Sequence, residues 1–469
     1  MLPPLIHREG KNDDKPSKQR GVTIALVAVS MVVIIGMAAL SIDVGLLYQA
    51  KADAQRAADA AALAAARLIS ISGVTGDPNN SSGSWQLTCG AAGTATLAAT
   101  AVAQSPANVV GGVPAANVKV TYGPGAGSND CSTLAGPGST FSVNPTVNVY
   151  VQQANLPTFF GRIFSLISGG TSKNSGVSAT ATAEVYNPSG SGSLGSGMVP
   201  VQPRCVKPWI IPNIDPTPGH AAGFVSNTTG AISSAGIYPN GVIGESFPMN
   251  GDCTAATAGG CTPLVNPPAP LGGVLLYVPA LVQNTSSAVP SCLADPASDY
   301  QQAIAGCDQT TVYACGTPLG AQVDLLNENP VHPTPATGDT ATSVQCLTNL
   351  SPGLGPGGPA DTLEAATYPF QIQAGSSNPL VTQGVVASNS LITTSNSIVT
   401  IPIYDNNGTR LVGQQQVTII GFLQVFINSV DTLGNINVTV MNVSGCSNAA
   451  TAQPVNGSSP VPVRLITPP

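Results

Sequence analysis

Charged side chains are scarce in this chain of 469 residues, of which only 8% are Asp, Glu, Lys or Arg. A typical soluble protein has about a quarter. From residue 190 onward, 4 Lys and Arg stand against 13 Asp and Glu, too few cations to neutralise a phosphate backbone. Aromatic residues make up 4%, which leaves few rings on which bases could stack. Nucleic acid is therefore excluded as a partner.

Histidine is equally rare, with three residues, and no Cys-x-x-Cys pair occurs, which argues against a zinc site. The nucleophile motif Gly-x-Ser-x-Gly is absent, because residues 244–248 read Gly-Glu-Ser-Phe-Pro. Residues 405–408 resemble the start of a calcium loop that lacks its distal Glu. We interpret His220 and His332, in Pro- and Thr-rich loops, as exposed loop residues. We therefore expect no catalytic residue, no metal ion and no cofactor.

The chain does contain one long apolar run, Gly21–Ile42, without a single charge. As a helix it spans about 33 Å, enough to cross a bilayer core of about 30 Å. We expect Gly21, Val32, Ile34 and Ile42 to lie in a membrane anchor. A cleaved signal peptide is the alternative, but its apolar region is shorter, about 7–15 residues, and its cleavage site follows directly. A retained anchor is preferred.

Positive charge flanks this run on its N-terminal side, at Lys18 and Arg20. Flanking Lys and Arg residues stay in the cytoplasm. The sequence therefore predicts a cytoplasmic N-terminus, with the bulk of the chain on the outer side of the membrane.

Alanine, the best helix former, dominates the residues that follow the anchor, Asp43–Leu68. Small and apolar residues there alternate in steps of three and four, which places them on one face of a helix. This packing stripe consists of Leu47, Ala50, Ala54, Ala57, Ala61, Ala64 and Leu68. Its small side chains allow close packing, either on a helix of another subunit or on the protein's own first domain.

All ten cysteines lie beyond the apolar run and none before it, which is typical of an oxidising exterior. We expect disulfides among them, and the spacing of eight residues within two pairs, 253/261 and 307/315, suits bridges that close small loops. The candidates are Cys89, Cys131, Cys205, Cys253, Cys261, Cys292, Cys307, Cys315, Cys346 and Cys446.

Beyond the anchor, alternating β-branched segments and turn residues predict strands at 117–122, 146–152 and 176–186 and several more between 368 and 445. We expect short helices at 91–104, 156–167, 301–305 and 320–326, a loop at 70–90, and hairpin turns at Asn407–Gly408 and Gly434–Asn435. For the C-terminal end an antiparallel, sandwich-like sheet is predicted.

The N-terminal region resembles the TadE/TadG-like family. The resemblance lies in an Arg-Gly start, an apolar span that ends in Ile42-Asp43-Val44-Gly45, and the alanine-rich run from Gln55 to Ala66. Members are membrane-anchored, minor-pilin-like components of the tight-adherence (Flp-type) pilus machinery of bacteria. The resemblance implies a small pilin-like α/β unit after the stalk helix and extends, less specifically, to about residue 187. It also implies that the anchor lies in the inner (cytoplasmic) membrane of a bacterium and that the bulk of the chain is periplasmic or extracellular.

Together these observations predict an α+β fold: a long transmembrane and stalk helix with a small pilin-like α/β unit, then a β-rich, disulfide-containing extracytoplasmic region. The expected organisation is a disordered cytoplasmic tail (1–20), a transmembrane helix (21–42), the stalk helix and α/β unit (43–187), a Gly/Ser linker (188–199), a Pro- and Cys-rich region (200–360) and an antiparallel β domain (361–469).

The function that this organisation favours is structural, not enzymatic: assembly of, or adhesion by, a Flp-type pilus. Its expected partners are the lipid bilayer and, through the alanine-rich helix, other pilus-assembly subunits. Two alternatives stay open. One is an anchored carbohydrate- or surface-binding module, and the other is an extracellular glycan hydrolase, because paired catalytic carboxylates need no local motif.

Overall fold

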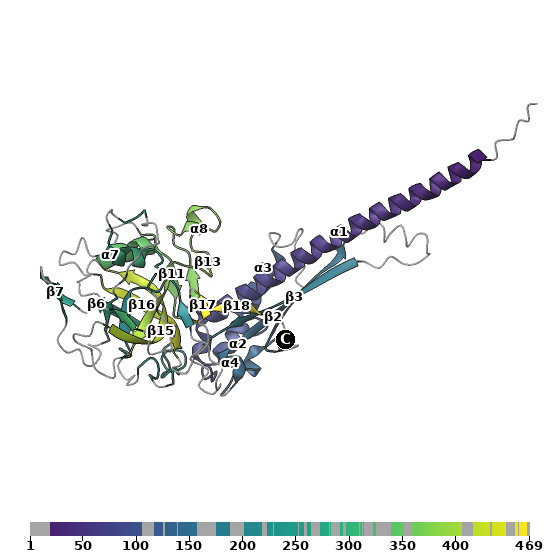
Figure 1. The fold of residues 1–469 in the computed structure, drawn as a ribbon. Coiled ribbons are helices and arrows are strands. Elements are labelled where there is room, and N and C mark those ends of the chain that lie inside the picture. The colour runs from purple at the N-terminus through teal and green to yellow at the C-terminus, as the bar shows by residue number, and fades with distance from the viewer. Residues whose placement is uncertain are drawn as a thin grey trace, which may run out of the picture. The chain divides into compact units, whose positions relative to one another are not determined.

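One continuous helix, α1 (Gln19–Ser72), contains the apolar run and the alanine-rich run in the computed structural model (Figure 1). No proline interrupts these 54 residues, and alanine favours the helix throughout its second half. The helix ends where Gly73 adopts a left-handed φ of 74°. A Cβ at Gly73 would lie 2.2 Å from the carbonyl oxygen of Met441, so only glycine fits this close approach.

The structure describes residues 19–105, 117–124, 127–137, 139–156, 175–187, 201–217, 223–227, 229–251, 253–257, 260–263, 273–280, 282, 291–293, 297–308, 310–311, 313, 322–324, 339–350, 359–405, 416–431, 434–446, 455–457 and 459–466. The chain divides into two compact units. Unit 1 comprises Met1–Ala54 and Gln152–Ser178, and unit 2 comprises Gln55–Val151 and Ala179–Pro469.

A four-stranded sheet in the order β1-β2-β3-β18 combines strands from both ends of the chain. Its strands are β1 (Val118–Tyr122), β2 (Thr146–Leu156), β3 (Ser175–Val185) and β18 (Val463–Ile466). The last strand, β18, pairs antiparallel with β3, and the Arg464 Nε lies 2.8 Å from the Glu184 Oε2. The three strands predicted between 117 and 186 are therefore present, and the C-terminus adds a fourth.

Short helices follow α1 in the segment 70–90, so the loop predicted there is wrong. They are η1 (Val74–Gly76) and α2 (Ser84–Cys89), with α3 (Thr94–Gln104), η3 (Cys131–Thr133) and α4 (Thr140–Val143) further along. Asp77 accounts for this difference, because its carboxylate accepts hydrogen bonds from the backbone N–H groups of Ser81 and Ser82. Burial of Trp85 then holds α2 in place, with its indole N–H donating to the Asp77 carbonyl at 2.9 Å.

The larger sheet of unit 2 closes on itself. Its order is β10-β15-β14-β5-β9-β6-β16, and β15 also pairs with β16. The pairings therefore form a ring of six described strands, a β-barrel: β5 (Trp209–Pro212), β6 (Ser246–Gly251), β9 (Leu275–Pro279), β14 (Ile398–Tyr404), β15 (Gln416–Val430) and β16 (Ile436–Gly445). Strand β10 (Gln322–Asp324) extends the ring through β15.

The barrel differs from the antiparallel sandwich that the sequence predicts. Strands β14 and β5 pair in parallel, as do β6 and β9, whereas β14–β15–β16 is antiparallel. The antiparallel pairing of β15 with β16 agrees with the hairpin predicted at Gly434–Asn435, where Gly434 takes a φ of 83°. The turn predicted at Asn407–Gly408 lies outside the described residues. Strands from 200–360 and from 361–469 share this sheet, so it crosses the boundary that composition predicts at residue 360.

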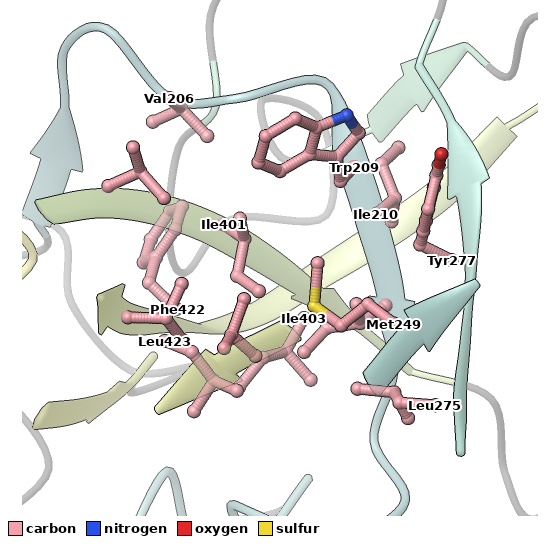
Figure 2. Packing of buried hydrophobic residues seen from close by; sticks show 14 of the residues in the cluster. Val206, Trp209, Ile210, Met249, Leu275, Tyr277, Ile401, Ile403, Phe422 and Leu423 are labelled. Carbon is pink, nitrogen blue, oxygen red and sulfur yellow. The ribbon is translucent and has the colours of Figure 1, made fainter. Parts of the chain in front are cut away.

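Large apolar side chains are buried on both faces of the barrel sheet (Figure 2). Trp209 and Ile210 come from β5, Met249 from β6 and Tyr277 from β9, and all are buried. Phe422 of β15 packs among them and is equally inaccessible. A six-stranded barrel has room only for side chains, and its interior is accordingly a packed core.

The remaining elements surround the barrel: strand pairs β4 (Val201–Pro203) with β17 (Val455–Gly457) and β7 (Cys253–Thr257) with β8 (Gly260–Pro263), a sheet of β11 (Thr362–Glu364), β12 (Gln371–Gln373) and β13 (Leu391–Ile392), and helices α6 (Asp299–Ala305), α7 (Asp339–Leu347) and α8 (Pro379–Thr382).

Two local predictions in this part are wrong. The helix predicted at 320–326 is strand β10, because β15 offers it an antiparallel partner. Among the strands predicted between 368 and 445, the one at 379–388 begins instead as helix α8, because the Asn378 side chain caps it and Pro379 occupies its first turn. The amphipathic helix predicted at 156–167 lies, from residue 157 on, outside the described residues.

Three disulfides confirm the expectation that cysteines of this chain form bridges: Cys89–Cys131, Cys205–Cys307 and Cys292–Cys346. Cys446 is also disulfide-bonded. The small loop predicted from the spacing of Cys307 and Cys315 is wrong, because Cys307 pairs across 102 residues with Cys205. The side chains of Cys253, Cys261 and Cys315 lie outside the described residues.

Candidate functional site: helix α1 and its junction with the barrel

The first part of α1 exposes apolar side chains on every face. Of the predicted anchor residues, Val32 is 68% exposed, Ile34 60% and Ile42 55%, while Gly21 lies in the first turns of the helix. The most apolar stretch has a mean hydropathy of 2.6 and is not buried at all. A core helix would bury at least one face. This segment is therefore long and apolar enough to cross a membrane and lacks the cover that a soluble protein would give it.

The second part of α1 is covered by the chain itself. Within the predicted packing stripe, Ala50, Ala54, Ala57 and Ala61 are buried, and Leu47, Ala64 and Leu68 are partly buried. The stripe widens after residue 57, because further residues that the spacing did not single out are also buried: Ala58, Ala62, Ala65, Ala66 and Ile69.

Strand β3 lies beside this part of α1 in unit 2, because the Gln55 side-chain amide donates to the Thr180 carbonyl of β3 at 3.2 Å. Of the two partners considered for the stripe, the protein's own domain covers its central residues, so those residues are not available to another subunit's helix.

The end of α1 is joined to the barrel by a buried polar network, which we call the junction network: Ser70, Thr75, Asn187 and Asn442. The Asn442 amide of β16 donates to the Ser70 carbonyl at 2.8 Å and to the Thr75 hydroxyl at 3.2 Å. The Asn187 amide donates to the same hydroxyl and to the Val443 carbonyl, both at 3.1 Å. Buried amides satisfied on both sides fix a unique geometry.

A second hydrogen bond ties the same turn of α1 to the C-terminal segment. The Ser70 hydroxyl donates to the Val461 carbonyl at 2.8 Å, and both residues are buried. The network therefore connects helix, barrel and C-terminus. Sequence reasoning missed it, because Asn442 is one of many asparagines in a β-rich segment and nothing in its spacing singles it out.

Lys207 is a buried cation beside the barrel, and it serves a structural purpose. Its ammonium donates to the carbonyls of Ala303, Ile304 and Gly306, at 3.3, 2.6 and 2.7 Å, at the end of helix α6. Burial lowers its pKa to about 7. The three carbonyls lie at the C-terminal end of α6, where the helix dipole attracts positive charge. Lys207 therefore caps α6.

Two buried carboxyl groups, Asp215 and Glu245, form a pair near the barrel. Burial, together with the charge and hydrogen bond of Asp215, raises the pKa of Glu245 to about 9. Each residue is 1% exposed, so a polymeric substrate has no access to these carboxyls. Neither His220 nor His332 belongs to the described residues.

Asp361 is buried, and its carboxylate connects two turns of the chain. Its carboxylate accepts from the Gly375 N–H at 2.8 Å and from the Asn378 amide at 2.9 Å. It precedes strand β11 and holds the turn before α8, so its role is structural. Among the described residues, no group of three or more His, Cys, Asp or Glu is placed to hold a metal ion.

An apolar groove of about 310 Å³ lies beside the end of α1 in unit 2. Leu68 and Ile71 of α1, Leu97 of α3 and Leu391 of β13 contribute to its walls, with Phe370 between them. Leu97 and Leu391 stay 58% and 61% exposed. The groove contains no charged side chain, and its polar lining residues are Ser72, Thr94, Gln371 and Thr393.

Comparison with known proteins found a family match for helix α1. Residues 21–68 match the family model of Flp pilus-assembly TadE/G-like proteins. The resemblance predicted for the N-terminal region is therefore confirmed, and the matched segment contains both the exposed apolar part of α1 and its alanine-rich part. No curated protein and no solved structure matches the chain. The match relates the chain to membrane proteins of Flp pilus assembly, a structural family.

Proposed function

We propose that this protein is a membrane-anchored envelope protein of TadG-like type with a structural role in a Flp-type pilus system, in assembly or in surface adhesion. The observation that carries the proposal is that the exposed apolar part of α1 falls within the matched segment 21–68. The same uninterrupted helix ends in the junction network. One continuous helix thus contains both the proposed membrane anchor and a residue of the junction network, Ser70.

The proposed location is the inner membrane of a bacterium, with the N-terminus in the cytoplasm and the barrel outside. Lys18 and Arg20 support this orientation. The disulfides Cys89–Cys131, Cys205–Cys307 and Cys292–Cys346 support an oxidising compartment for unit 2.

Deletion of the gene tests this role. We expect fewer surface pili in electron micrographs and weaker adhesion, with both restored by the wild-type protein and by the conservative variant Ile34→Leu. The variant Ile34→Arg, which disrupts the anchor, should not restore them. Normal pili and normal adhesion in the deletion strain would refute the role.

The enzymatic and carbohydrate-binding alternatives receive no support from the described residues. The carboxyl pair of Asp215 and Glu245 is closed to solvent, and the groove at Leu97 and Leu391 is lined mainly by apolar side chains and contains no charged one. Turnover or binding of any member of a glycan panel by the purified full-length protein would reinstate these alternatives.

A further inference from the structure

Asp43 does not face the surroundings of α1, although it directly follows the apolar run. Its side chain is 5% exposed, whereas its neighbours Ile42 and Val44 are 55% and 42% exposed. The rest of the chain therefore covers one face of the helix at this level and leaves the others open. Leu47, partly buried, and Ala50, buried, continue the covered face at steps of four and three residues. The charge of Asp43 thus points towards the protein, not towards lipid.

The open faces of α1 stay apolar beyond Asp43. Val44 and Leu46 are exposed, and Tyr48 is 75% exposed. A Cβ at Gly45 would meet nothing within 4 Å, so this side of the helix has no cover from the described chain. The exposed apolar surface of the anchor is therefore continuous to Tyr48, and tyrosine is the residue type enriched where a bilayer meets water.

The next charged residue is Lys51, whose ammonium donates to the Ser178 carbonyl of β3. Between Arg20 and Lys51 lie 30 residues, of which only Asp43 is charged. As a helix they span about 45 Å, which matches the roughly 40–45 Å thickness of a bilayer with its headgroups included. The 22 residues Gly21–Ile42 match the hydrocarbon core alone.

We propose that the outer headgroup layer of the membrane surrounds α1 from Asp43 to Ala50, with Val44, Leu46 and Tyr48 in contact with lipid and Asp43 turned towards the protein. The occupant of this open helix surface is the lipid bilayer itself, because the surface continues the membrane anchor without a break. The water-exposed part of the protein begins at Lys51. This inference rests on the membrane anchoring in the proposed function, and it adds the position along α1 at which the membrane ends.

Quenching of tryptophan by brominated lipid tests the position of this boundary. Full-length Tyr48→Trp is reconstituted in phosphatidylcholine vesicles whose acyl chains carry bromine close to the glycerol end. Ile34→Trp serves as the control inside the membrane, and Arg56→Trp, about 12 Å further along the helix than position 48, serves as the control outside. The native Trp85 and Trp209 are fully buried, and the wild-type protein measures their background.

We expect bromine to reduce the added fluorescence of Tyr48→Trp, which lies about 9 Å beyond Ile42 along the helix, less strongly than that of Ile34→Trp, and to leave Arg56→Trp unchanged. Val44→Trp should behave like Tyr48→Trp, which guards against a local defect of one variant. Quenching at position 48 no stronger than at position 56, while position 34 is quenched, would overturn the boundary and leave the anchor intact. Absence of quenching at position 34 would overturn both this inference and the anchoring on which it rests.

Discussion

The junction network makes a quantitative prediction for Asn442→Leu, a change that keeps the size of the side chain and removes its amide. Two short hydrogen bonds are lost: the amide to the Ser70 carbonyl at 2.8 Å, and the Val443 N–H to the Asn442 oxygen at 2.9 Å. Each contributes about 0.5–1.5 kcal/mol, and each backbone group left buried without its partner adds to the cost. We expect the free energy of unfolding to fall by about 3 kcal/mol.

The chain provides its own control on the same strand. Asn437 of β16 is exposed, and its amide bonds only to the Ser429 hydroxyl at 3.1 Å. Asn437→Leu should change the free energy of unfolding by no more than about 0.5 kcal/mol. Both variants replace an asparagine of β16 by leucine. They differ in the burial of that asparagine and in the hydrogen-bond partner that is lost.

Urea unfolding of the full-length protein in lipid nanodiscs measures both values, with fluorescence of Trp85 and Trp209 as the signal. With an m-value of about 3 kcal/mol per molar, the midpoint of Asn442→Leu should shift down by about 1 M. If Asn442→Leu were as stable as Asn437→Leu, the network would not hold α1 to the barrel and the reasoning would fail.

Three further predictions concern the anchor, the disulfides and the carboxyl pair. Ile34→Arg should raise the free energy of membrane insertion by about 3 kcal/mol, so that carbonate extraction releases it while Ile34→Leu stays in the membrane; equal retention would contradict the anchor. Peptide mapping without reductant should find Cys307 linked to Cys205, and the double variant Cys205→Ser/Cys307→Ser should lose up to about 4–5 kcal/mol of stability; a Cys307–Cys315 peptide would refute the pairing. Because burial and Asp215 raise the pKa of Glu245 to about 9, the folded state binds more protons than the unfolded state between pH 4.5 and that value, and stability falls as pH rises through this range. Glu245→Gln should remove this dependence and unfold at higher temperature than the wild type at pH 8; an unchanged difference between pH 5 and pH 8 would contradict it.

The features that the sequence alone determines are those that depend on neighbouring residues. The run Gly21–Ile42 predicts a membrane-spanning helix because length and lack of charge decide membrane insertion locally. The alanine-rich run 43–68 predicts a helix because helix propensity is also a local property. The family resemblance lies in these two runs. The sequence also predicts short strands that are bounded by turn residues, such as those on either side of Gly434.

Only the tertiary structure decides how distant segments meet. Closure of the barrel through β15 and β16, the parallel pairing of β14 with β5, and the return of β18 to β3 join segments that no local pattern relates. Asn442 and Ser70 are 372 residues apart. The entropy of closing a loop grows only slowly with its length, so spacing does not select a partner, as Cys307 shows by pairing with Cys205 instead of Cys315. The orientation of Asp43 has the same cause: its charge suggests an end to the apolar helix, and only the burial of its side chain by the rest of the chain shows that it does not lie on the exposed apolar faces.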